Sequence, residues 1–127
     1  MNIPIQPKRK SPPPLELVYV KPFSTGIQKV YTTRFYKAMN TGFGFEMLIK
    51  NNTSNLQEIK IGACAYDDRN NTVAKWNKTV SISAYSSYTQ SLTVTTGFTT
   101  MRDGKYSAQF WFNDKSITKK FFTIVRG

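Results

Sequence analysis

The clearest pattern in the chain is a strict alternation of apolar and other residues within segments of about ten residues. In the segment Gly42–Lys50, every second position is apolar: Phe43, Phe45, Met47 and Ile49. Successive side chains of a β-strand point to opposite faces of a sheet, so this spacing predicts a strand with one buried face. No segment shows a sustained 3.6-residue apolar period with capping residues, so the pattern predicts an all-β protein.

Two further segments alternate in the same way and belong to the same predicted core. In Gln57–Asp67 the odd-numbered positions from Ile59 to Ala65 are apolar, and in Tyr106–Phe112 the even-numbered positions are aromatic residues or alanine. Side chains spaced by two residues lie on one face of a strand. We therefore predict that the core includes Phe45, Met47, Ile59, Ile61, Tyr106, Ala108, Phe110 and Phe112.

The rest of the chain supplies shorter or less regular strands. The first is Leu15–Val20, and Pro22 places its end at a sheet edge or at a break, because proline has no N–H to donate. In Thr72–Ile82, Val73 and Trp76 fall on opposite faces, which predicts an edge strand or a bulge. The other predicted segments are Val30–Phe35 with Tyr31 and Phe35 as anchors, Tyr88–Thr95, the loop Thr96–Asp103, the turn Asn113-Asp114-Lys115 and the strand Ile117–Val125.

Seven or eight short strands with polar turns between them are typical of an antiparallel sandwich. The turn Asp103-Gly104 leads into the strand that begins near Tyr106. A tyrosine at this place in a late strand is typical of the tyrosine corner of immunoglobulin-like domains, in which the hydroxyl binds the backbone a few residues upstream. The predicted fold class is therefore an all-β, immunoglobulin-like antiparallel β-sandwich of seven or eight strands.

Residues 1–14 differ in composition from the rest of the chain. They hold five of the six prolines, together with Lys8, Arg9 and Lys10. Such a segment favours polyproline II or disorder, because its prolines and charges cannot form a packed core. We predict a Pro-rich basic linker or arm over residues 1–14 and one β-sandwich domain over residues 15–127. The arm is predicted to tether the domain to a neighbour, with binding of phosphate groups or of a partner as the alternative.

Several stretches of the strands carry a resemblance to a known class of domain. In order, they are VYTTRF (30–35), FEMLIKN (45–51), IKIGACAYD (59–67), GKYSAQFWFNDK (104–115) and FFTI (121–124). Over about residues 17–125 the chain resembles the bacterial immunoglobulin-like accessory modules that are appended to larger multidomain proteins. The resemblance implies a non-catalytic module beside protease, ATPase or repeat domains. The chain departs from the antibody-type pattern at Ala108, which stands where the second disulfide cysteine would be.

The composition leaves little for catalysis. The chain has one cysteine, Cys64, and no histidine, which excludes an internal disulfide, a Cys/His zinc site and a histidine general base. Adjacent Asp67 and Asp68 would diverge in a strand or a turn, whereas a general acid–base pair needs carboxylates that converge across a cleft. We therefore expect no enzymatic activity, no metal, no cofactor and no small-molecule substrate. The other carboxylates in strands are predicted to be solvated on outward faces: Glu16, Glu46 and Glu58.

The sequence also bears on location. No apolar run approaches the roughly 20 residues that a membrane-spanning helix requires. The N-terminus has no apolar region of the kind found in signal peptides. Together with the single cysteine, these features favour an intracellular location, unless the chain is a piece of a longer secreted protein.

The charge balance is strongly positive, with a net charge of +11 from 18 Lys+Arg and 7 Asp+Glu. A basic surface favours acidic partners such as nucleic acid. The lysines are spread along the chain, and Lys8-Arg9-Lys10 is the one tight cluster. Solubility alone is therefore the favoured explanation of the charge, and nucleic-acid binding is the alternative.

Two tryptophans complete the candidate residues. Trp76 lies between Lys75 and Lys78, and aromatic rings interleaved with lysines can stack on bases or sugars. Trp111 is predicted on the outward face of its strand, where a tryptophan often anchors an interface. Both rings could equally pack against their own domain. The candidate interaction surface comprises Lys8, Arg9, Lys10, Lys75, Trp76, Lys78 and Trp111.

These observations predict a non-enzymatic protein-interaction or spacer module that is part of a larger multidomain protein. Its expected partner is a protein or a neighbouring domain. One alternative is a nucleic-acid-binding or packaging-associated protein that uses the basic arm and surface. The other alternative is a carbohydrate-binding β-sandwich that uses Trp76 or Trp111. An apolar strand edge or patch would favour a protein partner, a contiguous basic face would favour nucleic acid, and a flat tryptophan platform would favour a sugar.

Overall fold

The computed structural model describes residues 13–127, which form nine strands and one short 3₁₀ helix. The predictions for residues 1–12, including Lys8, Arg9 and Lys10, lie outside the described residues. Six of the observed strands match their predicted limits to within about two residues: β4, β5, β6, β7, β8 and β9. The elements are β1 Leu15–Thr25, β2 Val30–Tyr31, β3 Arg34–Tyr36, β4 Gly42–Asn51, β5 Gln57–Tyr66, β6 Thr72–Ile82, β7 Ser87–Val94, η1 Phe98–Thr100, β8 Gly104–Phe112 and β9 Lys115–Val125.

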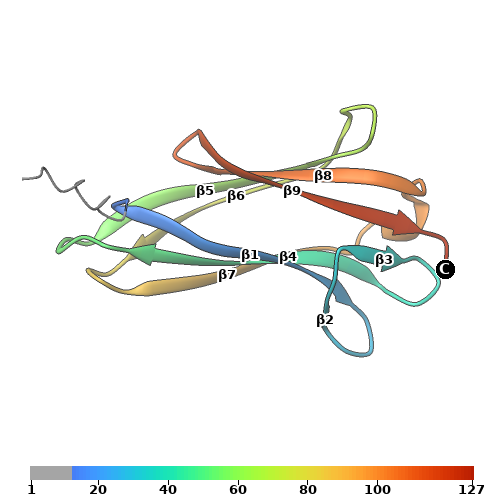
Figure 1. Cartoon of the computed structure of the whole chain (residues 1–127), viewed down its shortest axis with the longest axis horizontal. Coiled ribbons are helices and arrows are strands. Elements are labelled where there is room, and N and C mark those ends of the chain that lie inside the picture. Colours follow the sequence, from blue (N-terminus) through green and yellow to red (C-terminus); the bar gives the residue numbers. More distant parts are fainter. Residues whose placement is uncertain (1–12) are drawn as a thin grey trace, which may run out of the picture.

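The strands form two sheets that pack face to face (Figure 1). The four-stranded sheet has the order β2-β1-β4-β7, and the five-stranded sheet has the order β3-β9-β8-β5-β6. All neighbouring strands are antiparallel except β3 and β9, which are parallel. In an immunoglobulin-like sandwich, β1, β4 and β7 take the places of strands A, B and E, and β5, β8 and β9 take those of C, F and G. The predicted all-β sandwich is confirmed, but residues 13–127 form nine strands rather than the predicted seven or eight, and one strand pair, β3–β9, is parallel.

The eight predicted core residues are all buried between the sheets, with exposures of 0–6%. Aromatic rings dominate this core. Phe43 lies 5.0 Å from Phe35 and 4.9 Å from Phe122, and Phe122 lies 5.3 Å from Tyr106, all measured between ring centres. Ring pairs at such distances add stabilisation beyond the area they bury. This packing forms without a disulfide, since Cys64 is a free thiol.

The tyrosine corner is present as predicted. The hydroxyl of Tyr106 donates a hydrogen bond of 2.5 Å to the backbone carbonyl of Arg102, four residues upstream. The ring itself is 4% exposed and lies against Phe122. Burial raises the pKa of the Tyr106 hydroxyl, so the group stays protonated and remains a donor.

The segment Val30–Phe35 does not form the single predicted piece. It is divided into β2, which pairs with β1, and β3, which pairs with β9 in the other sheet. The chain therefore crosses from one sheet to the other between Tyr31 and Arg34. Phe35 is buried in the core as predicted, but Tyr31 is exposed on the outer face of the four-stranded sheet. Sheet switching of this kind depends on tertiary packing and leaves no signal in the alternation of a six-residue segment.

Two other local expectations also need correction. β1 does not end before Pro22 but continues to Thr25. Proline is tolerated because its backbone faces β2 rather than β4. Its carbonyl accepts a 3.1 Å hydrogen bond from the N–H of Thr32, and the ladder between β1 and β4 loses no bond. The predicted loop Thr96–Asp103 contains η1, and its Phe98 is fully buried.

Contacts with the domain also begin before Leu15. The carbonyls of Pro13 and Pro14 accept hydrogen bonds from the side chain and the backbone N–H of Asn52, respectively.

Candidate functional site

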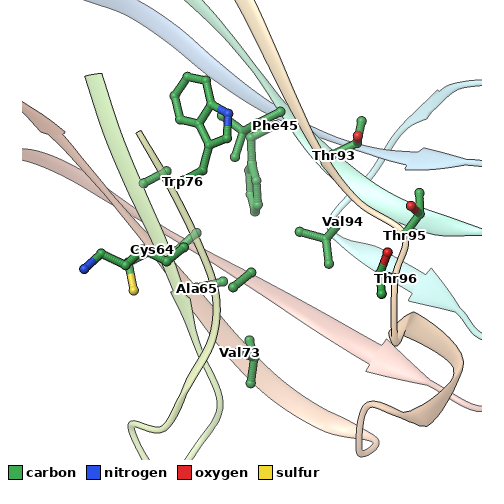
Figure 2. A pocket seen from close by; sticks show the side chains of 14 residues that line it. Phe45, Cys64, Ala65, Val73, Trp76, Thr93, Val94, Thr95 and Thr96 are labelled. Atoms are coloured by element: carbon green, nitrogen blue, oxygen red, sulfur yellow. The ribbon is translucent and has the colours of Figure 1, made fainter. Parts of the chain in front are cut away.

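An apolar cleft opens between the two sheets, beside the edge strands β6 and β7 (Figure 2). Its volume is about 280 Å³. In Figure 2, Trp76 lies on one side of the opening, and Thr93, Thr95 and Thr96 lie on the other. We call this feature the edge cleft. It is lined by Phe45, Ala63, Cys64, Ala65, Val73, Ala74, Lys75, Trp76, Leu92, Thr93, Val94, Thr95, Thr96 and Ala108.

The edge cleft exists because small side chains meet at this place in the core. Ala65 of β5 pairs with Ala74 of β6 on one side and with Ala108 of β8 on the other. Facing sheets lie about 10 Å apart, so a row of methyl groups leaves space that phenylalanine fills elsewhere in this core. The alternation of apolar residues predicted that Ala65 and Ala108 face inward, but it predicted neither the orientation of Ala74 nor the clustering of the three alanines.

Strand β7 forms one border of the edge cleft, and its outer edge is open. In the standard immunoglobulin arrangement, strand D pairs with strand E. Here no strand among residues 13–127 pairs with the second edge of β7, because β6 pairs with β5 instead. β7 therefore ends the four-stranded sheet.

The hydrogen-bond pattern identifies the backbone groups that point to the open edge. The N–H of Asn51 donates to the carbonyl of Ser86 at 2.9 Å, which makes this a hydrogen-bonded pair of the β4–β7 ladder. Such pairs alternate with non-bonded pairs in antiparallel strands. Thr89, Ser91 and Thr93 occupy the non-bonded positions of the register, so their N–H and C=O groups point away from β4.

The four edge strands of the sandwich differ in their protection against further pairing. β2 and β3 contain two and three residues, which is too short to offer a ladder. β6 carries Lys75 and Lys78, and Lys78 shares the inward-facing row with Trp76 and Val80. Inward-pointing lysine is a common device that blocks the pairing of an edge strand. β7 has eight residues and no charged residue, proline or bulge.

The predicted tryptophans lie on opposite faces of the five-stranded sheet. Trp76 pairs with Ala63 on the inner face and is partly buried against the core. Trp111 pairs with Gly62 and is half-buried on the outer face, as predicted. Lys75 is exposed on the outer face, whereas Lys78 is exposed on the inner row of the edge strand. These four predicted residues therefore do not form one surface, and the two rings do not form a shared platform.

The four-stranded sheet carries a polar cluster on its outer face that the sequence did not predict. The carboxylate of Glu46 accepts hydrogen bonds from Lys29 Nζ at 2.7 Å and from the hydroxyls of Tyr19 and Tyr31 at 3.0 Å each. Glu46 faces outward as expected, but the expectation of a merely solvated carboxylate was wrong. The Lys29 ammonium, assisted by the two hydroxyls, holds the pKa of Glu46 below its usual value, and the same bonds raise the pKa values of Lys29 and Tyr19. The cluster fastens β2 and its hairpin to the sheet.

The residues considered for catalysis have structural roles. Asp67 accepts hydrogen bonds from the backbone N–H groups of Arg69 and Asn71, both at 2.9 Å, which closes the turn between β5 and β6. These hydrogen bonds lower the pKa of Asp67, and the bond from the Asn71 N–H has the largest effect. Asp68 pairs with Arg102 at 3.2 Å. Cys64 is buried, and its thiol lies 3.8 Å from the hydroxyl of Thr72.

The residues that the structure describes contain no group of three Cys, Asp or Glu side chains that could hold a metal ion. Within residues 13–127, no helix has the length and hydropathy needed to cross a membrane.

The comparisons with known proteins bear on the fold. No family model matches the sequence, and no curated protein matches it. Solved structures do match. The C-terminal domain of Wzt aligns with a TM-score of 0.65 and 9% identity, over 90% of this chain and 75% of that chain. The alkylpurine DNA glycosylase AlkC from Pseudomonas fluorescens, bound to DNA containing an abasic-site analogue, aligns with a TM-score of 0.63 and 9% identity, over 90% of this chain and 31% of that chain.

A β-glucuronidase from glycoside hydrolase family 2 also aligns, with a TM-score of 0.52 and 15% identity, over 67% of this chain and 10% of that chain. The chain thus spans about a tenth of the β-glucuronidase and less than a third of AlkC. At these identities the similarity is one of fold. In both of these proteins, a β-sandwich like the present one is one part of a larger chain.

Proposed function

We propose that the chain is a non-enzymatic protein-interaction module that binds an extended segment of a protein partner along β7. The observation that supports this function is an open, uncharged strand edge directly beside an apolar cleft. The matches to parts of larger proteins support an accessory role of the same kind.

The two features fit the known mode of recognition by strand addition. In that mode, backbone hydrogen bonds to the sheet edge give affinity, and pockets for alternate side chains give specificity. Thr89, Ser91 and Thr93 offer the backbone groups. A side chain on the added strand that faces the core would enter the edge cleft, whose volume of about 280 Å³ exceeds that of one large apolar residue.

The segment bound should therefore alternate in character. Residues that face the cleft should be large and apolar, because they meet Leu92, Val94 and the row of alanines. The residues between them should be polar, because they continue the serine and threonine rows on the outer face of β7. Isolated extended peptides with this pattern are suitable probes.

The test is a selection of random 12-residue peptides, displayed on phage, against the immobilised domain. The proposal predicts enriched peptides with apolar residues at every second position. Their binding should be lost in Ser91→Pro, which removes an N–H at the open edge while leaving the bonds to β4 intact. The matched control is Ser91→Ala, which keeps the N–H and should bind normally.

A second variant tests the cleft separately. Ala74→Leu should weaken the selected peptides by filling the space between the sheets. Thermal unfolding of both variants establishes that they fold. The proposal would be contradicted if no peptide with alternating apolar residues were enriched. It would also be contradicted if the enriched peptides bound Ser91→Pro with the same affinity as the unaltered domain.

A further inference from the structure

A second surface, independent of β7, lies on the outer face of the five-stranded sheet. One cationic residue comes from each of the five strands, and all five are exposed. We call this surface the basic face: Arg34 of β3, Lys119 of β9, Lys105 of β8, Lys60 of β5 and Lys75 of β6. The pairing register places all of them outward, since their neighbours along each strand face the core.

Aromatic rings lie among these cations. Phe121 is 68% exposed and pairs with Ser107 on the outer face, and Lys119 Nζ lies 5.4 Å from the centre of its ring. Trp111 lies beside Gly62, and a side chain added at that glycine would stand 3.8 Å from the indole ring. A hollow of about 450 Å³ lies at this place, and Gly62, Trp111 and Lys75 are among the residues that border it.

Few carboxylates offset this positive charge. Glu46 lies on the other sheet, and Asp67, Asp68 and Asp103 are in ion pairs with Arg102 or Lys37. Glu58 near the start of β5 is the one acidic residue in the strands of the basic face, and Asp114 lies at the rim of the hollow. The row of paired residues that crosses the sheet from Lys75 through Cys64 and Gln109 to Lys119 contains no carboxylate.

We propose that the basic face binds single-stranded nucleic acid. Proteins that bind single strands combine a positively charged surface that follows the backbone with aromatic rings on which bases stack. The lysines here provide the charge complementarity, and Phe121 and Trp111 provide the rings. A duplex fits less well, because the major groove admits a helix or a two-stranded ribbon rather than a five-stranded face. An acidic polysaccharide would meet the lysines but has no bases for an exposed phenylalanine ring.

The experiment measures fluorescence anisotropy of a labelled oligothymidine of about 15 nucleotides, a length within the range of known site sizes. The logarithm of the binding constant should fall linearly with the logarithm of salt concentration. The double variant Lys75→Gln/Lys119→Gln should lower that slope by about 1.4, because each phosphate contact to a single strand contributes about 0.7. Phe121→Ala should weaken binding about tenfold, the usual effect of losing one stacked base.

The matched control removes the same charge from the other sheet. Lys21→Gln/Lys50→Gln changes two lysines that lie outward on β1 and β4 and should leave the slope unchanged. A duplex of equal length and heparin are the competing ligands. The proposal would be overturned by any of four results. These are absence of binding at low salt, a decrease of the salt slope in the control variant equal to that in Lys75→Gln/Lys119→Gln, unchanged binding of oligothymidine by Phe121→Ala, and a preference for the duplex or heparin.

Discussion

The hydroxyl of Tyr106 donates a hydrogen bond to the backbone carbonyl of Arg102 across the turn that leads into β8. The bond ties the loop after η1 to the start of a core strand. Tyr106→Phe keeps the buried ring and removes only this bond, so we expect a loss of about 1 kcal/mol in the free energy of unfolding. Chemical denaturation measures the change. Tyr85→Phe is the control, since the Tyr85 ring is 62% exposed and the substitution should leave stability unchanged.

Asn51 is a second polar residue on which the core depends. Its side chain is fully buried and donates to the carbonyls of Asn55, Ile82 and Ser83, while its oxygen accepts from Thr53. Asn51→Ala would leave these buried groups without partners, and we expect a loss of about 3 kcal/mol. Urea denaturation checks this value. A loss below about 0.5 kcal/mol would show that water replaces the amide.

The cluster around Glu46 predicts a dependence of stability on pH. The folded-state pKa of Glu46 lies below its ordinary value, chiefly because of Lys29. A depressed carboxylate pKa stabilises the fold above the unfolded-state pKa, and this stabilisation is lost as pH falls through the folded-state pKa. The free energies of unfolding of the unaltered domain and of Glu46→Gln, measured from unfolding curves, should therefore converge as the pH is lowered through the acid range. A constant difference between the two proteins through this range would contradict the assignment.

The edge cleft predicts that two substitutions, each to a larger side chain, have different effects on stability. Ala74→Leu adds atoms to an open apolar space and should change stability by less than about 1 kcal/mol. Gly44→Ala should cost about 1–3 kcal/mol, because the new methyl group would stand 2.5 Å from both the Leu92 carbonyl and the Phe23 ring. Thermal unfolding of the two variants compares them directly. Equal destabilisation would mean that the cleft is already filled.

The sequence predicted those parts of the fold whose signal is local. β4, β5 and β8 each turn a row of alternate apolar residues to the core, so their alternation identified it, and the turn before Tyr106 identified the corner. The division of Val30–Phe35 between two sheets was not predictable, because it depends on which strands lie nearby. The same applies to Phe98, whose burial follows from the fold around a short 3₁₀ turn.

The candidate surfaces were less predictable than the fold. Lysines that are spread along the sequence gather on one face, because alternate residues of adjacent strands share a side of the sheet. The open edge of β7 and the row of alanines likewise depend on strand order and register, which no single segment encodes. Glu46 is separated from Tyr19 by 27 residues, so their contact had no local signal.

The central claim, that β7 accepts an added strand, is tested most directly by amide hydrogen exchange measured by NMR. In the free domain, the amides of Thr89, Ser91 and Thr93 should exchange rapidly, because they point to the open edge. With a selected peptide bound, the account predicts slowed exchange at these three amides and unchanged exchange along the outer rows of β5 and β8. Unchanged exchange at Thr89, Ser91 and Thr93 with the peptide bound would contradict the claim.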